Sequence, residues 1–311
     1  MIKKSLILFS IIIVFLTTFN LSLNKEKYCF AAAEDQKIRD KIFETKDKVD
    51  EYIKKQYGSK TNFAFTTTHN VGVLSTRNAD SWWLTYKYNN MLEWSSVNNK
   101  LDLNRDGVIN SKDDLGKENS ICSPTAAAII MRYLVLVGKI NYTPRIKYDL
   151  NGSLTDSPTD VFNVFYELVD SYISCGWQGS ATTSQVELDS MNHFLKKNNS
   201  SLTMNFSNKN MIDKIKSNFD RGLPCVGHIV SENSDVGHTF TIAGYYTKEI
   251  TYTEKVFLIT QSKKVNLHFL VINTGWTDST MGDSGGSTQE EYDENYSYVL
   301  LDDVYNITYF I

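Results

Sequence analysis

The sequence predicts an α+β fold in which a helical region precedes a region of antiparallel strands. Helical spacing of apolar residues dominates positions 122–219, whereas β-branched and aromatic runs dominate from position 226 onward. Helices followed by strands, rather than alternating with them, are typical of α+β proteins. A chain of 311 residues, with 41% of them hydrophobic, can build one large domain with a real core.

The N-terminus has the pattern of a secretory signal peptide. Lys3 and Lys4 precede an apolar run over residues 6–19, which is too short and too close to the N-terminus for a lasting membrane span. Residues 31–33 are Ala-Ala-Ala, an A-x-A cleavage site, so we expect residues 1–33 to be removed and the protein to be secreted. No second long apolar segment follows, so no permanent membrane anchor is expected.

The net charge of the chain indicates which classes of binding partner are unfavourable. The whole chain has a formal net charge of −4, and the leader carries four lysines against one glutamate. Without its net +3, the mature chain would carry about −7. Such a charge argues against nucleic acid or an anionic membrane surface as partner.

Residues 34–75 are expected to form an N-terminal helix and a linker, ahead of a main domain over residues 76–311. Ile38, Ile42, Val49 and Ile53 recur at helical spacing among charges, which predicts one exposed amphipathic helix over residues 34–57. This helix is either a pro-segment or packs on the domain. Residues 62–94 lack a helical period, and loops with short strands are expected there.

Further elements follow from periodicity and from turn residues. Amphipathic spacing predicts helices at 157–173, 183–197 and 208–219. Apolar or alternating runs predict strands at 226–230, 238–246, 255–260, 267–273 and 296–301.

A cysteine lies where a loop turns into an Ala-rich apolar helix, in the run Ser-Ile-Cys-Ser-Pro-Thr-Ala-Ala-Ala around Cys122. A helix start presents unpaired backbone N–H groups and the positive end of the helix dipole, and both lower the pKa of a thiol. Two later blocks contain the partners that a thiolate nucleophile needs: Gly-His-Thr-Phe-Thr-Ile-Ala-Gly-Tyr with His238, and Val-Ile-Asn-Thr-Gly-Trp with Asn273.

These three blocks, in this order, resemble the bacteriocin-processing (double-glycine) peptidase-like family and, more distantly, streptopain, both of the papain-like clan. The resemblance implies a papain-like fold, in which a helical half carrying the cysteine helix packs on an antiparallel β half carrying His238 and Asn273. It further implies that Cys122 is the nucleophile, that His238 forms an ion pair with it and protonates the leaving amine, and that Asn273 orients the imidazole. Trp276 would shield that last hydrogen bond.

One part of the family pattern is missing. The clan supplies an oxyanion-hole glutamine shortly before the cysteine, and no glutamine occurs between Gln56 and Gln178. Asn119 is the candidate replacement, because its amide could donate beside the backbone N–H of Cys122. Among the other histidines, His228 is the second candidate for the base because it also follows a glycine.

A calcium loop is predicted at residues 102–113, nine residues ahead of Cys122. Oxygen-bearing side chains alternate along it, Gly107 allows the sharp bend, and an acid closes it at the twelfth position. A hard cation is of no use to a thiolate, so the calcium would be structural, and no organic cofactor is expected. The predicted ligands are Asp102, Asn104, Asp106, the carbonyl of Val108, and Asp113.

The sequence thus predicts a secreted cysteine peptidase acting on a peptide or protein substrate. The alternative is a non-catalytic, calcium-stabilised binding module on the same fold. The Gly-Asp-Ser-Gly-Gly run around Ser284 copies the nucleophile block of chymotrypsin-like serine proteases, but it continues into a polar stretch, which favours a loop. Cleavage of the leader would leave Cys122, Cys175 and Cys225, an odd count, so at least one thiol should be free.

Overall fold

The computed structural model describes residues 36–71, 122–143, 161–177, 182–231, 237–275 and 296–311. The predicted signal peptide, the predicted calcium loop, Asn119, Trp276 and the Ser284 run lie outside these residues. The described chain is a mixture of helices and antiparallel strands, as expected for an α+β protein.

The helices are α2 (Gln36–Arg39), α3 (Lys46–Tyr57), α5 (Cys122–Leu136), α6 (Val161–Ser174), α7 (Ser184–Lys197) and α8 (Met211–Asp220), with a short 3₁₀ turn at Leu301–Asp303. The strands are β1 (Ile42–Phe43), β2 (Thr61–Val71), β3 (Met204–Ser207), β4 (Cys225–Val230), β5 (Gly237–Val256), β6 (Ile259–Asn273), β7 (Ser297–Leu300) and β8 (Val304–Phe310). Within the described ranges the strands form one sheet in the order β1-β7-β6-β5-β4-β8-β3, and β2 pairs with β5.

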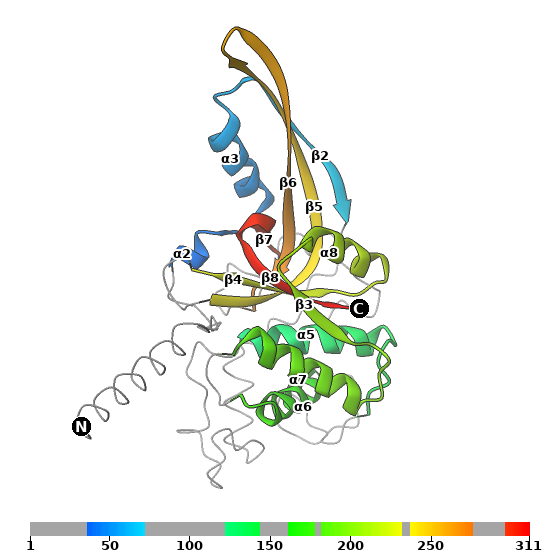
Figure 1. Cartoon of the computed structure of the whole chain (residues 1–311). Coiled ribbons are helices and arrows are strands. Elements are labelled where there is room, and N and C mark those ends of the chain that lie inside the picture. The colour runs from blue at the N-terminus through cyan, green and yellow to red at the C-terminus, as the bar shows by residue number, and fades with distance from the viewer. Residues whose placement is uncertain (1–35, 72–121, 144–160, 178–181, 232–236, 276–295) are drawn as a thin grey trace, which may run out of the picture.

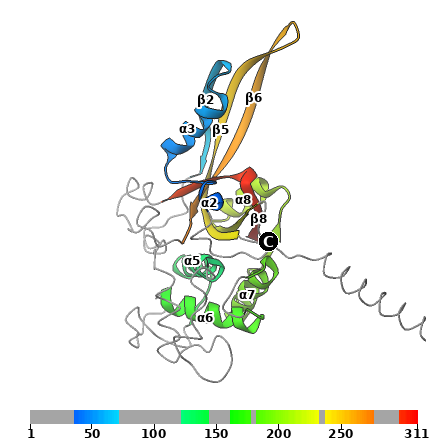
Figure 2. The same ribbon diagram turned by 90° about the vertical axis from the view of Figure 1, so that its left-hand side faces the viewer.

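The sheet lies between two sets of helices (Figures 1 and 2). α5, α6 and α7 lie on one side, and α8 lies on the other. α5 is apolar around nearly its whole circumference, and every residue from Cys122 to Leu134 is buried, because the helix is covered by the sheet and by its neighbouring helices. The core therefore lies on both sides of α5. The predicted nucleophile, Cys122, is the first residue of this helix and is buried.

The N-terminal region differs from the single helix predicted for residues 34–57. The chain leaves α2, pairs Ile42 with Val299 in the sheet, and restarts as α3 behind Thr45. Thr45 caps the new helix by accepting a hydrogen bond from the Lys48 N–H at 3.3 Å. The four apolar residues that suggested one helix are all buried, but pairing with β7 overrides the helical period. With β2 paired to β5, this region contributes two strands to the sheet.

A long antiparallel hairpin rises from the sheet (Figure 1). β5 and β6 stay paired from Thr241 and Asn273 out to Val256 and Ile259. We call β2 and residues 247–268 of this hairpin the arm. α3 runs beside the arm and is tied to it by an ion pair of 2.7 Å between Asp50 and Lys248. The strand predicted at 255–260 is wrong: these residues form the end of the hairpin, with Phe257 and Leu258 as its two-residue turn.

Helices α7 and α8 agree closely with their predicted ranges. Thr183 is the N-cap of α7 and accepts from the Val186 N–H at 3.2 Å, which is why this helix starts one residue after the cap. β3 and β8 were not predicted, and they pair with each other along the edge of the sheet. No helix in the described part of the chain is both long and apolar enough to cross a membrane.

Candidate functional site

Cys122 is the first residue of α5, and its side chain is buried. The first backbone N–H groups of a helix have no partner within the helix, so this end carries a partial positive charge that favours a thiolate. Pro124 in the first turn removes one of these N–H groups without breaking an intrahelical bond. Cys122 is in no disulfide, and neither is Cys175 or Cys225.

The imidazole of His238 is buried near the start of β5 and is held at one ring nitrogen. Nε2 lies 2.7 Å from the carbonyl oxygen of Thr274, so Nε2 carries the hydrogen and donates it. Nδ1 is therefore the nitrogen that takes a proton when the ring becomes charged. Burial lowers the pKa of His238 to about 3, although the Thr274 carbonyl acts in the opposite direction. At this value the ring is neutral at pH 7, which is the form that can accept the proton of a thiol.

Asn273 has a different contact from the one the family resemblance implies. Its Oδ1 accepts from the Gly275 N–H at 2.8 Å, which closes a turn directly after β6. The imidazole of His238 is bonded to the backbone carbonyl of the next residue, Thr274. Asn273 thus shapes the turn that presents this carbonyl, and Thr274 contributes the contact to the ring.

Three distant stretches of the chain meet at the first turns of α5. Thr241 on β5 donates from Oγ1 to the carbonyl oxygen of Ala126 at 3.2 Å, which fixes the helix on the strand. Gly275, after β6, lies beside the same helix, because a Cβ there would be in ordinary van der Waals contact with Cγ2 of Thr125, at 3.5 Å. His238 and Thr274 join the two strands at this place.

The alternation of side chains along β5 adds a constraint on this site. Thr239 and Thr241 face the helices, and successive side chains of a strand point to opposite faces. The ring of His238 therefore starts from the face opposite these two threonines and reaches the end of β6 at Thr274.

Beside the site lies a buried polar network centred on Glu187 of α7, whose side chain is fully buried. Its Oε1 accepts from Nε2 of His228 at 3.0 Å and from Oγ1 of Thr308 at 2.8 Å. Its Oε2 accepts from Oγ of Ser123 at 2.6 Å. Tyr172 then donates to Ser123 at 2.8 Å, because the serine hydrogen is already used; burial raises the pKa of this phenol well above its ordinary value.

The Glu187 network links the chain neighbours of the two candidate catalytic residues. Ser123 directly follows Cys122, and Thr239, which lies 3.1 Å from Nδ1 of His228, directly follows His238. Both ring nitrogens of His228 are engaged in these contacts, so this histidine is a member of the network. Sequence reasoning missed Glu187; the available signal was an acid four residues before Met191, on the apolar face of an amphipathic helix.

The three remaining histidines lie on α7, β6 and β2. His193 is half-buried on α7, and His268 on β6 lies 2.9 Å from Oγ1 of Thr247, in the arm. His69 belongs to β2, where its backbone pairs with Thr247. Among the described residues no cluster of three or more His, Cys, Asp or Glu side chains could hold a metal ion, and the predicted calcium loop lies outside them.

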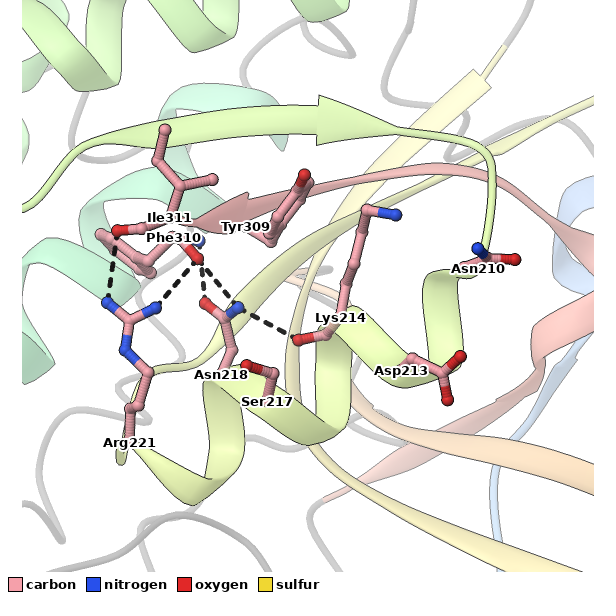
Figure 3. A pocket seen from close by; sticks show the side chains of 9 residues that line it. All are labelled: Asn210, Asp213, Lys214, Ser217, Asn218, Arg221, Tyr309, Phe310 and Ile311. Carbon is pink, nitrogen blue, oxygen red and sulfur yellow. Dashed lines mark hydrogen bonds between the residues drawn. The ribbon is translucent and has the colours of Figure 1, made fainter.

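A surface pocket of about 370 Å³ lies elsewhere, between α8 and the end of β8 (Figure 3). Asn218 clamps the backbone of Phe310 there, donating to its carbonyl at 3.0 Å and accepting from its N–H at 2.8 Å. Arg221 donates to the carbonyls of Phe310 and Ile311, both at 3.3 Å. Asn218 and Arg221 therefore hold the last strand in place, so their contacts in this pocket are structural.

No protein-family model matches the sequence, and no curated protein matches it either.

Proposed function

We propose that this protein is a secreted cysteine peptidase with a papain-like arrangement, in which Cys122 attacks a peptide or amide carbonyl. One observation carries the proposal: the first turns of α5 are hydrogen-bonded to β5, near His238, and lie beside the turn after β6. A helix-start cysteine, a buried histidine with one ring nitrogen fixed, and a third segment that fixes it are the parts of a thiol acyl-transfer site.

In the proposed reaction Sγ of Cys122 adds to the carbonyl carbon, and its proton passes to Nδ1 of His238. The imidazolium then gives this proton to the leaving amine nitrogen as the carbon–nitrogen bond breaks, which leaves a thioester on Cys122. Water hydrolyses the thioester, with His238 taking and returning a proton. The Thr274 carbonyl accepts the Nε2 hydrogen throughout, and so it stabilises the charged ring that burial opposes. The N–H groups at the start of α5, with Asn119, would stabilise the oxyanion.

Glu187 supports this proposal as a positioning residue. It joins Ser123 to His228, and His228 contacts Thr239, so one buried carboxyl sets the distance between the helix that carries Cys122 and the strand that carries His238. Such positioning matters because a small displacement of reacting groups lowers the rate strongly.

The direct test is hydrolysis of an unstructured protein substrate such as reduced, alkylated casein. Cys122→Ala should lower kcat/KM by at least about a thousandfold, because the nucleophile is lost. Cys175→Ser is the matched control: this thiol is half-buried at the end of α6, and its removal should leave the rate unchanged. Equal hydrolysis by wild type and Cys122→Ala would refute the assignment.

The alternative function, a non-catalytic binding module on the same fold, also has an observation in its favour. Thiol and imidazole are both buried, and the ring is neutral and starts from the strand face opposite the threonines that contact α5. In such a module Cys122 would be a packing residue, and its thiol would react no faster with His238 present than without it.

We also propose that residues 102–113 bind a structural calcium ion. Removal of calcium by a chelator should then lower the melting temperature, and Asp102→Asn with Asp106→Asn should lower it in calcium without further change on chelation. A wild-type melting temperature that does not move on chelation would contradict the site.

A further inference from the structure

The outer end of the arm exposes apolar residues to water. Val256, Phe257, Leu258 and Ile259 are consecutive, and their side chains are 39%, 94%, 91% and 64% exposed. We call these four residues the tip. They lie at the end of the hairpin farthest from the helices α5, α6 and α7 (Figures 1 and 2). Scattered exposed apolar residues are ordinary, but four in succession on a protruding hairpin form a patch that marks an interaction site.

The backbone of the tip is also poorly suited to its residues. Val256 pairs with Ile259, so Phe257 and Leu258 form a two-residue turn, and Phe257 has φ of +59°. Tight hairpin turns prefer Gly or Asn at a position with positive φ, because a side chain there crowds the backbone. A phenylalanine is thus kept at a strained position where it buries almost nothing within the fold. Folding stability does not account for either feature.

The charges next to the tip are mostly positive. Lys60, Lys255, Lys263 and Lys264 flank it against two glutamates, Glu254 and Glu249, whereas the whole chain has a net charge of −4. Lys263 lies 3.3 Å from Glu254, and Lys264 lies 2.6 Å from Glu249 farther down the hairpin. The ammonium of Lys60 lies 5.7 Å from the centre of the Tyr252 ring, and the Tyr57 ring is 5.9 Å from the same ring. An apolar end is therefore followed by a belt of tyrosine rings and lysines.

We propose that the tip inserts into the surface of an anionic lipid bilayer. A convex two-residue turn needs a matching cavity on a protein partner, whereas lipid tails adapt to any apolar shape. Two rungs of a hairpin span about 5–7 Å, which matches the depth at which interfacial segments bury apolar side chains. The lysines would then lie at the level of the headgroups, where each gains from the negative surface potential, and tyrosine is common at this level. The negative net charge of the whole chain argues against binding to an anionic bilayer, but the charge next to the tip is positive.

The proposal does not depend on the peptidase activity, and the test uses the full chain and sedimentation with vesicles. Binding to vesicles of equal parts phosphatidylcholine and phosphatidylglycerol is compared with binding to pure phosphatidylcholine. The tip variant is Phe257→Gly with Leu258→Asn, which suits the turn and removes the apolar end. Phe206→Ser is the control, since Phe206 is an exposed aromatic residue on β3, away from the arm.

Wild type and Phe206→Ser should bind the anionic vesicles alike, and the tip variant should bind them at least about tenfold more weakly, the loss expected when two large side chains no longer enter the apolar layer. Lys60→Gln with Lys255→Gln should weaken binding several-fold and reduce its dependence on salt. Melting temperatures show that the variants are folded. The proposal is overturned if the tip variant binds the anionic vesicles as wild type does, or if the tip changes only the oligomeric state and not vesicle binding, which would make it an interface between copies of the chain.

Discussion

The two ends of β5 differ in which side chains they bury and which they expose to water. At its start, around His238 and Thr239, polar side chains are buried and joined to buried partners on β4 and directly after β6. At its end, around Val256 and Phe257, apolar side chains stand in water on a strained turn. One strand thus buries polar groups at one end and exposes apolar groups at the other. Both ends depart from the usual preference for apolar side chains inside and polar side chains outside.

The difference between the two ends lies in whether the unfavourably placed side chains have contacts that compensate for their cost in stability. Polar groups buried at the start of β5 are tolerated because they have partners: Thr239 joins the Glu187 network through His228, and His238 donates to the Thr274 carbonyl. The exposed tip has no compensating contact within the described chain and therefore costs stability in the isolated protein. Replacing residues in the first region should lower stability, and replacing residues in the second should raise it.

The largest expected effect is at Glu187. Glu187→Ala leaves His228, Ser123 and Thr308 facing a buried gap, and should lower the free energy of unfolding by about 3–5 kcal/mol. Urea denaturation followed by circular dichroism measures it. Gln185→Ala, an exposed position on the same helix, should change the free energy by less than about 0.5 kcal/mol. A similar small change for Glu187→Ala would show that the network is not the constraint described above.

The second effect is a pH dependence set by His238. Its pKa is about 3 in the folded state and about 6.5 in the unfolded chain, so the unfolded state binds more protons between these values. Stability from this group is complete above about pH 6.5 and is lost as the pH falls toward 3. Between pH 7 and pH 5 the free energy of unfolding should fall by about 2 kcal/mol through His238 alone.

Urea denaturation of wild type and His238→Gln at the two pH values checks this expectation, since glutamine does not titrate. The difference in stability between pH 7 and pH 5 should be smaller in the variant by that amount. An unchanged difference would mean that His238 is not a buried neutral base.

The smallest effect is expected at the tip and has the opposite sign. Phe257→Gly relieves the positive φ and removes a side chain that packs on almost nothing, so it should raise the free energy of unfolding by up to about 1 kcal/mol. A thermal or urea melt measures the gain. A loss of stability on this change would show that the phenylalanine packs within the fold, and it would remove the contrast between the two ends of β5.

The parts of the fold that the sequence predicts are those with local signals. Thr183 is a capping residue directly before an amphipathic run, and α7 starts there. Cys122 directly precedes a long apolar run, which predicts a buried helix, and α5 begins at Cys122. The break of the N-terminal helix at Ile42 had no such signal, because it depends on pairing with β7, far along the chain.

The hairpin turn at Phe257 and Leu258 and the buried Glu187 network could not be predicted from the sequence, because no local sequence signal marks the turn or the partners of Glu187. Phe257 and Leu258 extend a β-branched and aromatic run, and the Gly or Asn that marks a tight turn is absent, so the run reads as a strand. Glu187 meets its partners from α5, β4 and β8 only in three dimensions. The same holds for Thr274, whose carbonyl contact with His238 depends on backbone geometry rather than residue type.

The central claim is that His238 activates the thiol of Cys122, and the rate of alkylation of that thiol tests it most directly. Wild type and His238→Gln are treated with iodoacetamide at neutral pH, and mass spectrometry follows modification of Cys122 and Cys175 in the same molecules. Cys122 should react at least about tenfold faster in wild type, because only there can the imidazole take its proton, while Cys175 reacts equally in both. Equal rates at Cys122 in the two proteins would contradict the account and leave the binding-module function in its place.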